Sequence, residues 1–322
     1  MAFEPPPRLV RALGETAPDG DDWLARVSAT ARREVDLRAL TVERVQVPGG
    51  RSSLVVLVRQ ADGTPAVLKL APRRARPESE RAALAHWGGA GAVQLLESAT
   101  GSAGSGDSGD SGDSDDSHTS GGDGVLLLER LHPDVSVRSL PEAKALLEAA
   151  GTLRRLWVEP PVGSAAVFET VAARTGRQAE AMSATAGTDA TVAPLVEAAL
   201  AAREELLVAP PEARLLHGTF RQSKVLAAGR VPWLAVGPDP VVGECAFDLA
   251  RLVRDRVEDL IASSSGAAIT RRRVKRLAES LDVDQERLRG WTLFRAVESG
   301  VRALRVGRVR DAELLLEFAG WL

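Results

Sequence analysis

Hydrophobic positions in the first part of the chain follow the pattern of short β-strands. Residues 54–58 and 66–70 are apolar runs of strand length, and the turn-forming sequence Ala-Asp-Gly-Thr lies between them. Two such runs joined by a turn predict a β-hairpin. Residues 93–96 and 125–128 have the same strand-like character, whereas residues 78–87 have the apolar spacing of a helix. We therefore expect mainly strands in this part of the chain.

After Leu131 the apolar positions change to helical spacing. Two short apolar runs around residues 227–230 predict a second β-hairpin within this part. The helical patterns span residues 141–157, 192–208, 246–261, 270–281 and 288–306. A small sheet-rich part followed by a larger helical part predicts an α+β fold.

Residues 98–124 differ from the rest of the chain in composition. They are almost wholly Gly, Ser, Asp, Ala and Thr, with six aspartates and no lysine or arginine. Because so few apolar side chains cannot offset the entropy of ordering, we predict a disordered insertion at the tip of the hairpin formed by residues 93–96 and 125–128. A calcium-binding loop would need alternating ligand positions and a terminal glutamate, which this segment lacks.

Composition and charge exclude several classes of protein. The chain has 322 residues, with 44 acidic and 41 basic side chains and a formal net charge of −3. This balance predicts no overall attraction to nucleic acid or to an anionic membrane. No apolar run approaches the roughly 18 residues of a membrane-spanning helix. The N-terminus has three consecutive prolines and no apolar signal core, so we expect a cytoplasmic protein.

Three further features have structural interpretations. The basic run at residues 271–276 lies in a helical pattern with Val274 and Leu277 on its inner side, which is typical of a solvated helix face rather than a DNA-binding surface. His132 has no cluster of partner residues, so we interpret it as a surface turn residue. The single cysteine, Cys245, excludes an intrachain disulfide and a cysteine-cluster metal site.

The sequence Pro-Gly-Gly-Arg-Ser-Ser at residues 48–53 precedes the first strand of the hairpin. Gly49 and Gly50 would let backbone amides approach a phosphate, because no side chain blocks them. Ser52 and Ser53 complete this candidate nucleotide-binding segment. An ordinary turn is the alternative interpretation.

Lys69 lies in the second strand of the hairpin and is one of only four lysines in the chain. Kinases use a strand lysine at such a place to hold nucleotide phosphates, and a carboxylate from the next helix orients it. Glu80, in the predicted helix, is the candidate partner, and Glu78 is the competing one. The alternative is a strand-end lysine whose ammonium is solvated.

Residues 215–248 carry the most specific signal. They read Leu-Leu-His-Gly-Thr-Phe-Arg-Gln-Ser-Lys-Val-Leu and, further on, Trp-Leu-Ala-Val-Gly-Pro-Asp-Pro-Val-Val-Gly-Glu-Cys-Ala-Phe-Asp-Leu-Ala. This resembles the aminoglycoside phosphotransferase superfamily, in its streptomycin 6-kinase and hydroxyurea phosphotransferase branch. That branch carries L-L-H-G-D-L-H-P-G-N-V-L followed by W-L-A-I-D-P-K-P-L-V-G-D-P-A-F-D-L-A. The resemblance covers nearly the whole chain outside residues 98–124.

The resemblance implies a two-lobed, protein-kinase-like fold. We expect an N-lobe at residues 1–131, with the nucleotide-loop hairpin, and a helical C-lobe at residues 132–322. The resemblance also implies ATP as the ligand, with the backbone from Glu129 to Leu131 facing the adenine. His217 and Asp248 match residues that brace the catalytic loop in the family, so their implied role is structural.

Three positions depart from the family motifs. Thr219 stands where the family has the catalytic aspartate, and Lys224 stands where it has a magnesium-binding asparagine. Gly237 replaces the second magnesium ligand, an aspartate. Threonine has no accessible ionisation near neutral pH, glycine has no side-chain donor, and a lysine brings positive charge to a cation site. These departures argue against magnesium binding and predict a pseudokinase.

We therefore interpret the chain as a catalytically inactive relative of antibiotic-modifying phosphotransferases that keeps ATP as a candidate ligand. Its role would be binding or regulation, with an unidentified protein as a possible partner. The alternative is an active ATP-dependent O-phosphotransferase that uses Asp239 or Glu244 as surrogate residues. A folded module that binds only a protein partner is a third hypothesis, since a fold alone does not define a function.

Overall fold

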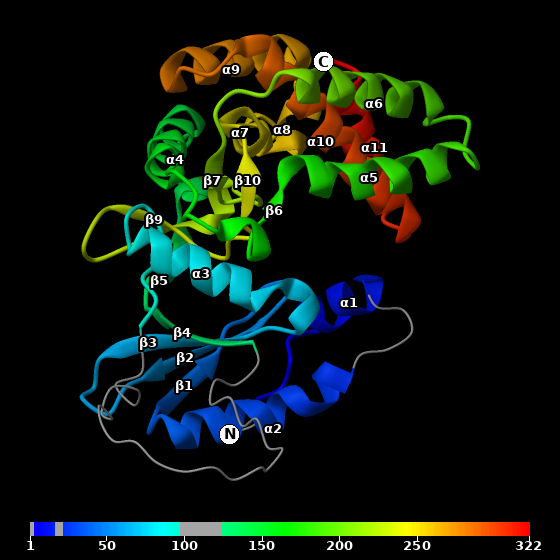
Figure 1. Cartoon of the computed structure of the whole chain (residues 1–322). Helices are drawn as coiled ribbons and strands as arrows, with labels where there is room; N and C mark the ends of the chain where they lie inside the picture. Colours follow the sequence, from blue (N-terminus) through cyan, green and yellow to red (C-terminus); the bar gives the residue numbers. More distant parts are fainter. Residues whose placement is uncertain (1–2, 17–21, 97–123) are drawn as a thin grey trace, which may run out of the picture. The chain divides into compact units, whose positions relative to one another are not determined.

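The computed structural model describes residues 3–16, 22–96 and 124–322 (Figure 1). Its contacts divide the chain into two compact units, which are described separately. The first unit comprises Met1–Arg81 and Gln94–Arg130, and the second comprises Ala82–Val93 and Leu131–Leu322. The predicted lobes, 1–131 and 132–322, stay a prediction; the contacts place residues 82–93 and Leu131 with the second unit.

A four-stranded antiparallel sheet is the centre of the first unit, in the order β1-β2-β3-β4. The strands are β1 (Thr41–Val45), β2 (Leu54–Arg59), β3 (Pro65–Leu70) and β4 (Val125–Glu129). The predicted hairpin is confirmed as β2 and β3, with Val55 opposite Lys69 in the register. Strand β3 lies between β2 and β4, so both sides of its backbone are hydrogen-bonded and Lys69 has a fixed place.

Two N-terminal helices, α1 (Pro7–Thr16) and α2 (Asp22–Leu37), lie beside this sheet (Figure 1). Leu9, Leu13, Val27 and Ala31 of these helices join the apolar face of β2 and β3 in one buried core. The expectation of mainly strands before residue 98 was therefore wrong for this region. The buried residues of α1 are Leu9, Ala12 and Leu13. Their spacing is typical of a helix, but this short pattern was not among the predicted elements.

The segment at residues 93–96 is not a regular strand, contrary to the prediction. Leu96 N donates to Leu127 O at 2.8 Å and Glu129 N donates to Gln94 O at 2.9 Å. Val93 N instead donates to Ala235 O, so the segment changes its partner after one residue and cannot continue a ladder. The predicted disordered insertion lies outside the described residues, except for Gly124.

The second unit is mainly helical, and α10 (Gln285–Arg305) is its central helix. Trp291, Phe294 and Val297 of α10 are fully buried, and the helix packs against α6, α7 and α11 (Figure 1). The other helices of this unit are α4 (Glu142–Leu156), α5 (Val171–Ala186), α6 (Ala193–Val208), α7 (Cys245–Val253), α8 (Val257–Ile261), α9 (Gly266–Leu281) and α11 (Val309–Ala319). Helix α3 (Pro77–Trp87) begins in the first unit and ends in the second.

Most predicted helices are confirmed, and one is wrong. The pattern at residues 246–261 predicted one helix, but the structure has α7 and α8 separated by a turn in which Arg256 has a φ of 59°. A left-handed residue cannot continue an α-helix, so the chain changes direction there. Helices α5 and α11 were not predicted.

The second unit also has two small three-stranded sheets, and the loop at residues 217–224 connects one to the other. One has the order β6-β10-β7, and the other has the order β5-β8-β9, whose β8 and β9 confirm the second predicted hairpin. His132 is the exposed first residue of β5. The strands are β5 (His132–Ser136), β6 (Glu169–Thr170), β7 (Arg214–Leu216), β8 (Val225–Ala227), β9 (Trp233–Ala235) and β10 (Val241–Gly243). Short 3-10 helices are η1 (Arg73–Ala75), η2 (Val137–Ser139), η3 (Ser164–Ala166) and η4 (Gln222–Lys224).

Within the described part of the chain, no helix combines the length and the apolar character needed to span a membrane.

Candidate functional site

The loop at residues 217–224 connects β7 to β8, and a buried carboxylate holds its beginning. Asp248 Oδ2 accepts a hydrogen bond from His217 N at 2.8 Å, and Oδ1 accepts one from Gly218 N at 3.0 Å. Asp248 lies in α7 and is fully buried, which raises the pKa of its carboxyl. Gly218 has a φ of 76°, and a Cβ on it would lie 1.9 Å from Asp239 O, so the loop needs glycine there. This geometry fits the structural role expected of Asp248.

Arg295, in α10, holds the same part of the loop from the carbonyl side. Its guanidinium donates to Gly218 O and to Phe247 O, both at 2.6 Å, and lies 4.0 Å from the centre of the Phe247 ring. Burial lowers its pKa well below the ordinary value for arginine. The sequence reasoning missed Arg295, because a buried arginine in a helix has no distinguishing sequence pattern.

His217 is a neutral structural residue in this loop. Thr219 N donates to its Nδ1 at 3.4 Å, so Nε2 carries the proton that reaches Val236 O at 3.2 Å. Burial first, and then the charge of Lys224, lower the pKa of the imidazole well below its usual value. The ring also packs edge-on against Phe220. His217 therefore connects this loop to the chain around Val236 without carrying charge at neutral pH.

The three positions that depart from the family motifs come together in space. Lys224 Nζ donates to Thr219 Oγ1 at 2.5 Å and to the backbone oxygen of Gly237 at 2.6 Å. Thr219 Oγ1 also donates to Gly237 O, at 3.4 Å. Gly237 has a φ of 62°, and a Cβ on it would be 3.8 Å from Lys224 Nζ. We call Thr219, Lys224 and Gly237 the Lys224 cluster.

The donor set of the Lys224 cluster does not fit a magnesium ion. Magnesium requires several oxygen ligands, usually including a carboxylate, whereas this cluster supplies one hydroxyl, one carbonyl and one ammonium group. Across residues 3–16, 22–96 and 124–322, no group of three or more His, Cys, Asp or Glu side chains is arranged to hold a metal ion. The ammonium of Lys224 bonds to both of the other members, so the cation of the cluster is part of the protein.

Asp239 lies two residues after Gly237, and its carboxylate contacts Arg174 of α5. The Arg174 Nη1–Asp239 Oδ2 distance is 3.2 Å and the Nη2–Oδ1 distance is 3.3 Å. Arg174 is buried and also contacts Glu169 Oε2 at 3.0 Å, while the Asp239 side chain is 38% exposed. The surrogate candidate Asp239 is therefore an ion-pair partner that still reaches solvent.

Glu244 has a structural role that argues against its use as a surrogate metal ligand. Its Oε1 accepts from Trp291 Nε1 and Arg287 Nη2, both at 2.6 Å, and its Oε2 accepts from Arg287 Nε at 2.7 Å. The residue is buried immediately before α7. Both oxygens are used to join the start of α7 to α10. The sequence reasoning missed this because Arg287 and Trp291 lie more than 40 residues away.

In the first unit, the structure brings Lys69 together with Glu80. Lys69, on β3, forms an ion pair with Glu80, in the first turn of α3, and the two side chains are 11% and 4% exposed. The competing candidate, Glu78, is 70% exposed and faces Arg81 at 3.7 Å. The helical repeat explains this choice, because two residues along a helix turn a side chain to the opposite face.

The glycine-rich segment lies between β1 and β2 of the same unit. Gly49 has a φ of 71°, and a Cβ there would lie 2.9 Å from Gln46 O, so this position requires glycine. Gly50 has ordinary contacts, Ser52 is exposed and Ser53 is buried. Arg51 in the middle of the segment pairs with Glu15 of α1 at 2.5 Å.

The two residues expected to face an adenine have different surroundings. Glu129 ends β4, and its Oε2 accepts from Gln94 N at 3.0 Å. Leu131 is buried and belongs to the second unit. Their nucleotide-binding role stays a prediction.

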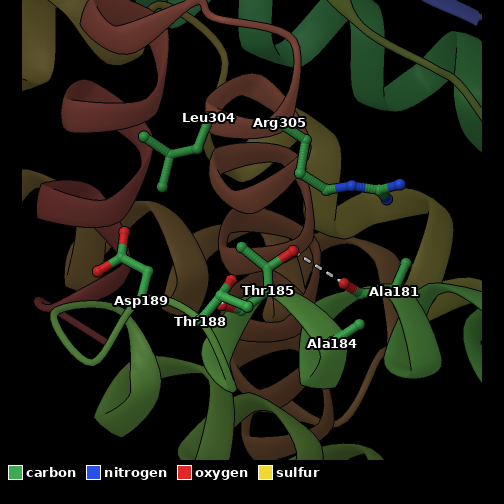
Figure 2. Close-up of a pocket in the computed structure, with 7 residues that line it drawn as sticks. All are labelled: Ala181, Ala184, Thr185, Thr188, Asp189, Leu304 and Arg305. Carbon is green, nitrogen blue, oxygen red and sulfur yellow. Dashed lines mark hydrogen bonds between the residues drawn. The ribbon is translucent and has the colours of Figure 1, made fainter.

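The second unit has a cavity of about 470 Å³, and its lining residues, drawn in Figure 2, are not those predicted from the sequence. Residues at and after the end of α5 and at the end of α10 form its wall. They are Ala181, Ala184, Thr185, Thr188, Asp189, Leu304 and Arg305. Thr185 Oγ1 donates to Ala181 O within α5, and Asp189 Oδ1 accepts a hydrogen bond from Thr191 N. These polar groups therefore already have partners in the chain.

Solved structures identify the class of fold. The chain is similar to a thermostable mutant of aminoglycoside phosphotransferase APH(4)-Ia in a ternary complex with ADP and hygromycin B, with a TM-score of 0.59, 15% identity and coverage of 90% of this chain and 96% of that one. It is also similar to spectinomycin phosphotransferase APH(9)-Ia, with a TM-score of 0.56, 12% identity and coverage of 90% and 97%. The expected two-lobed, kinase-like α+β fold is confirmed.

Sequence comparisons identify the family. The model of the aminoglycoside/hydroxyurea antibiotic resistance kinase family matches residues 38–103 and 116–307. Streptomycin 6-kinase of Streptomyces griseus is 33% identical over 306 residues, which cover 92% of each chain. Hydroxyurea phosphotransferase of Kitasatospora aureofaciens is 34% identical over 282 residues, covering 84% of this chain and 74% of that protein. The chain therefore belongs to the aminoglycoside/hydroxyurea antibiotic resistance kinase family, as its motifs indicated.

Proposed function

We propose that this protein is a catalytically inactive member of its family. It binds a nucleotide through the ammonium group of Lys224 in place of a metal ion. The contact of Lys224 Nζ with both Thr219 and Gly237 carries this proposal. This contact joins a lysine amine to the other two positions at which the family motif has its base and its metal ligands. The role that follows is nucleotide-dependent binding or regulation rather than turnover.

The absence of catalysis follows from the chemistry of the Lys224 cluster. Phosphoryl transfer needs a group that accepts or orients the proton of the attacking hydroxyl, and threonine does not ionise near neutral pH. Thr219 Oγ1 also accepts a hydrogen bond from a cation, which stabilises any negative charge on it and makes it a weaker base. Transfer also needs metal ions that neutralise the phosphate charge, and the donor set does not fit magnesium.

Retention of nucleotide binding is supported by the pair of Lys69 and Glu80 in the first unit. A lysine held by a buried carboxylate is oriented before the ligand arrives, which reduces the entropy lost on binding. The solved structure of APH(4)-Ia in its complex contains ADP. ATP is therefore the ligand that we propose for this chain.

Calorimetric titration of ATP, with and without magnesium, tests this proposal. We expect ATP to bind with an affinity that magnesium changes by less than about twofold, because the cation is already part of the protein. Binding that requires magnesium would contradict the cluster's proposed role. Absence of binding in both buffers would overturn the proposal of nucleotide binding. It would favour the third hypothesis, a protein with a kinase-like fold that binds only a protein partner. A parallel assay for phosphorylation of streptomycin and hydroxyurea should give no product.

An active O-phosphotransferase is the second candidate function, and two observations favour it. The relatives named above are kinases with identities above 30%. In addition, the carboxylate of Asp239 is 38% exposed and so reaches solvent beside the loop. Under this hypothesis the phosphorylation assay gives product, and Asp239→Asn abolishes it. Asp259→Asn, at an exposed position on α8, does not. Product formation without sensitivity to Asp239 would remove this residue as the surrogate.

A further inference from the structure

The second half of the 217–224 loop is held by a turn that the sequence reasoning did not consider. This turn, residues 254–256, separates α7 from α8. Gln222 N donates to Asp255 Oδ2 at 2.6 Å, and Arg256 Nε donates to Gln222 Oε1 at 3.0 Å. Gln222 is 1% exposed, so both its backbone and its side chain are fixed inside the protein by two consecutive residues.

The contact with Asp255 cannot exist in the family motif as it stands. The motif L-L-H-G-D-L-H-P-G-N-V-L has proline at the position of Gln222. Proline has no N–H group, so it cannot donate the hydrogen bond that Asp255 accepts here. Proline restricts the backbone by its ring, whereas this chain restricts the same position by a hydrogen bond to a carboxylate. A hydrogen bond to an ionised group is roughly twice as strong as a neutral one.

The turn is itself held in place by several partners. Arg256 has a left-handed backbone and donates through Nη2 to Arg138 O at 2.8 Å and to Leu140 O at 2.9 Å. Arg273 Nη1 donates to Asp255 O at 2.7 Å. An unfavourable backbone conformation persists only where the surroundings over-determine it, and this turn meets that condition. It is therefore a rigid support for Gln222.

Gln222 is linked to the Lys224 cluster by a single turn of 3-10 helix. Lys224 is the last residue of η4, which begins at Gln222, and Lys224 N donates to Arg221 O at 2.9 Å. Fixing Gln222 therefore fixes the backbone from which the Lys224 side chain reaches Thr219 and Gly237. We propose that Asp255 and Arg256 are positioning residues that hold Lys224 through Gln222, with a contact that replaces the family's proline. The benefit to nucleotide binding rests on the proposed function, but the positioning itself does not.

Hydrogen exchange measured by mass spectrometry tests the positioning without any ligand. We expect Asp255→Ala to speed exchange of the amides at residues 219–226 by about tenfold, because a hydrogen bond to a charged group is lost. Asp255→Asn keeps an oxygen acceptor and should retain most of the protection. Asp259→Ala is the matched control and should change exchange in the loop by less than twofold. Faster exchange in α10 and α11 as well would mean general destabilisation and overturn the specific role.

A double-substitution experiment separates the hydrogen bond from other effects of Asp255. In a Gln222→Pro background the donor is absent, so adding Asp255→Ala should cause no further increase in loop exchange. An equal increase in both backgrounds would show that Asp255 acts elsewhere and would overturn the proposal. Retained protection in the single Gln222→Pro variant would support the view that ring and hydrogen bond are alternative restraints.

Titration of ADP without magnesium tests the consequence for binding. Asp255→Ala should lower the affinity for ADP by about tenfold. This loss of affinity should disappear in a Lys224→Met background, because the effect is transmitted through Lys224. Full additivity of the two losses would overturn transmission through Lys224. If the unmodified protein binds no ADP, the proposed function fails, while the exchange experiments still decide whether Asp255 positions the loop.

Discussion

Two of the four lysines, one in each unit, have different partners, and only one of the two arrangements departs from the family pattern. Lys69, in the first unit, pairs with a carboxylate, that of Glu80. Lys224, in the second unit, bonds to a hydroxyl and a backbone carbonyl, those of Thr219 and Gly237. The first arrangement is the one that the family motif implies, whereas the second replaces a base and metal ligands. The two lysines therefore separate a pair that matches the motif from a cluster that departs from it.

The loop that carries Lys224 shows the same separation on a smaller scale. Its backbone is held by Asp248, Arg295 and Asp255, which are buried or partly buried. Two of its side chains, Thr219 and Lys224, are the ones that differ from the motif. The contacts that hold the loop and the side chains that differ from the motif are therefore separate parts of the same segment.

Loss of the support at the back of the loop should have the largest effect. Asp248→Ala leaves two buried amides without an acceptor and leaves Arg295 without its buried acidic neighbour. We expect a loss of about 3–5 kcal/mol in the free energy of unfolding, measured by urea denaturation. Asp259→Ala, at an exposed position on α8, is the control and should change it by less than about 0.5 kcal/mol. A small effect at Asp248 would contradict the separation of shape from chemistry.

Removing each lysine ammonium compares the two units directly. Lys69→Met should weaken ATP binding by about ten- to a hundredfold in both the presence and the absence of magnesium, because a charge-assisted contact is lost. Lys224→Met should weaken binding to a similar degree in magnesium-free buffer. Lys275→Met, at an exposed site on α9, is the matched control. If neither Lys69→Met nor Lys224→Met changes the affinity for ATP, the comparison of the two lysines as nucleotide-binding residues is wrong.

The pH dependence of stability should report the neutral state of His217. Its pKa is lowered in the folded protein, so the unfolded chain binds more protons once the pH falls below the ordinary histidine value of about 6.5. Stability contributed by this residue is therefore present above that pH and lost as the pH falls. The slope should reach about 1.4 kcal/mol per pH unit in urea denaturation series between pH 7.5 and 5.5. His217→Asn should flatten this slope, and an unchanged slope would assign it to other groups.

Restoring one carboxylate should have the smallest effect on stability. Gly237→Asp puts a side chain at a left-handed position, which costs about 1–2 kcal/mol, although aspartate tolerates it better than most residues. Its Cβ would have ordinary contact with Lys224, so an ion pair should recover part of this cost. We expect magnesium-independent ATP binding to persist in this variant. Combining it with Lys224→Asn and Thr219→Asp should make binding magnesium-dependent, which calorimetry can measure.

Much of the fold and of the site could be predicted because the signals are local in the chain. The β2–β3 hairpin follows from apolar runs and a turn, and the helix at residues 78–87 follows from its periodicity. The residues of the Lys224 cluster were identified by their position within a dense motif between residues 215 and 248. Glu80 was preferred over Glu78 as the partner of Lys69, and the structure forms that pair.

Other features depend on contacts between residues far apart in sequence. The residues beside Glu244 in the sequence do not show whether it binds a metal ion or links the chain to Arg287 and Trp291. Helix α5 was missed, and with it Arg174, the ion-pair partner of Asp239. The break between α7 and α8 was also missed, because a left-handed arginine is stabilised by distant carbonyl groups rather than by its own preference.

The amino-acid sequence alone determined the family, the main secondary structure and the three departures from the family motifs, because these depend on residue identity and short-range spacing. Only the tertiary structure decided which groups the residues at these positions contact. It brought Thr219, Lys224 and Gly237 into hydrogen-bonding contact, and it placed Asp255 against Gln222. Such contacts depend on how β-strands and helices pack in three dimensions, because a hydrogen bond requires two groups within about 3 Å whatever their separation along the chain.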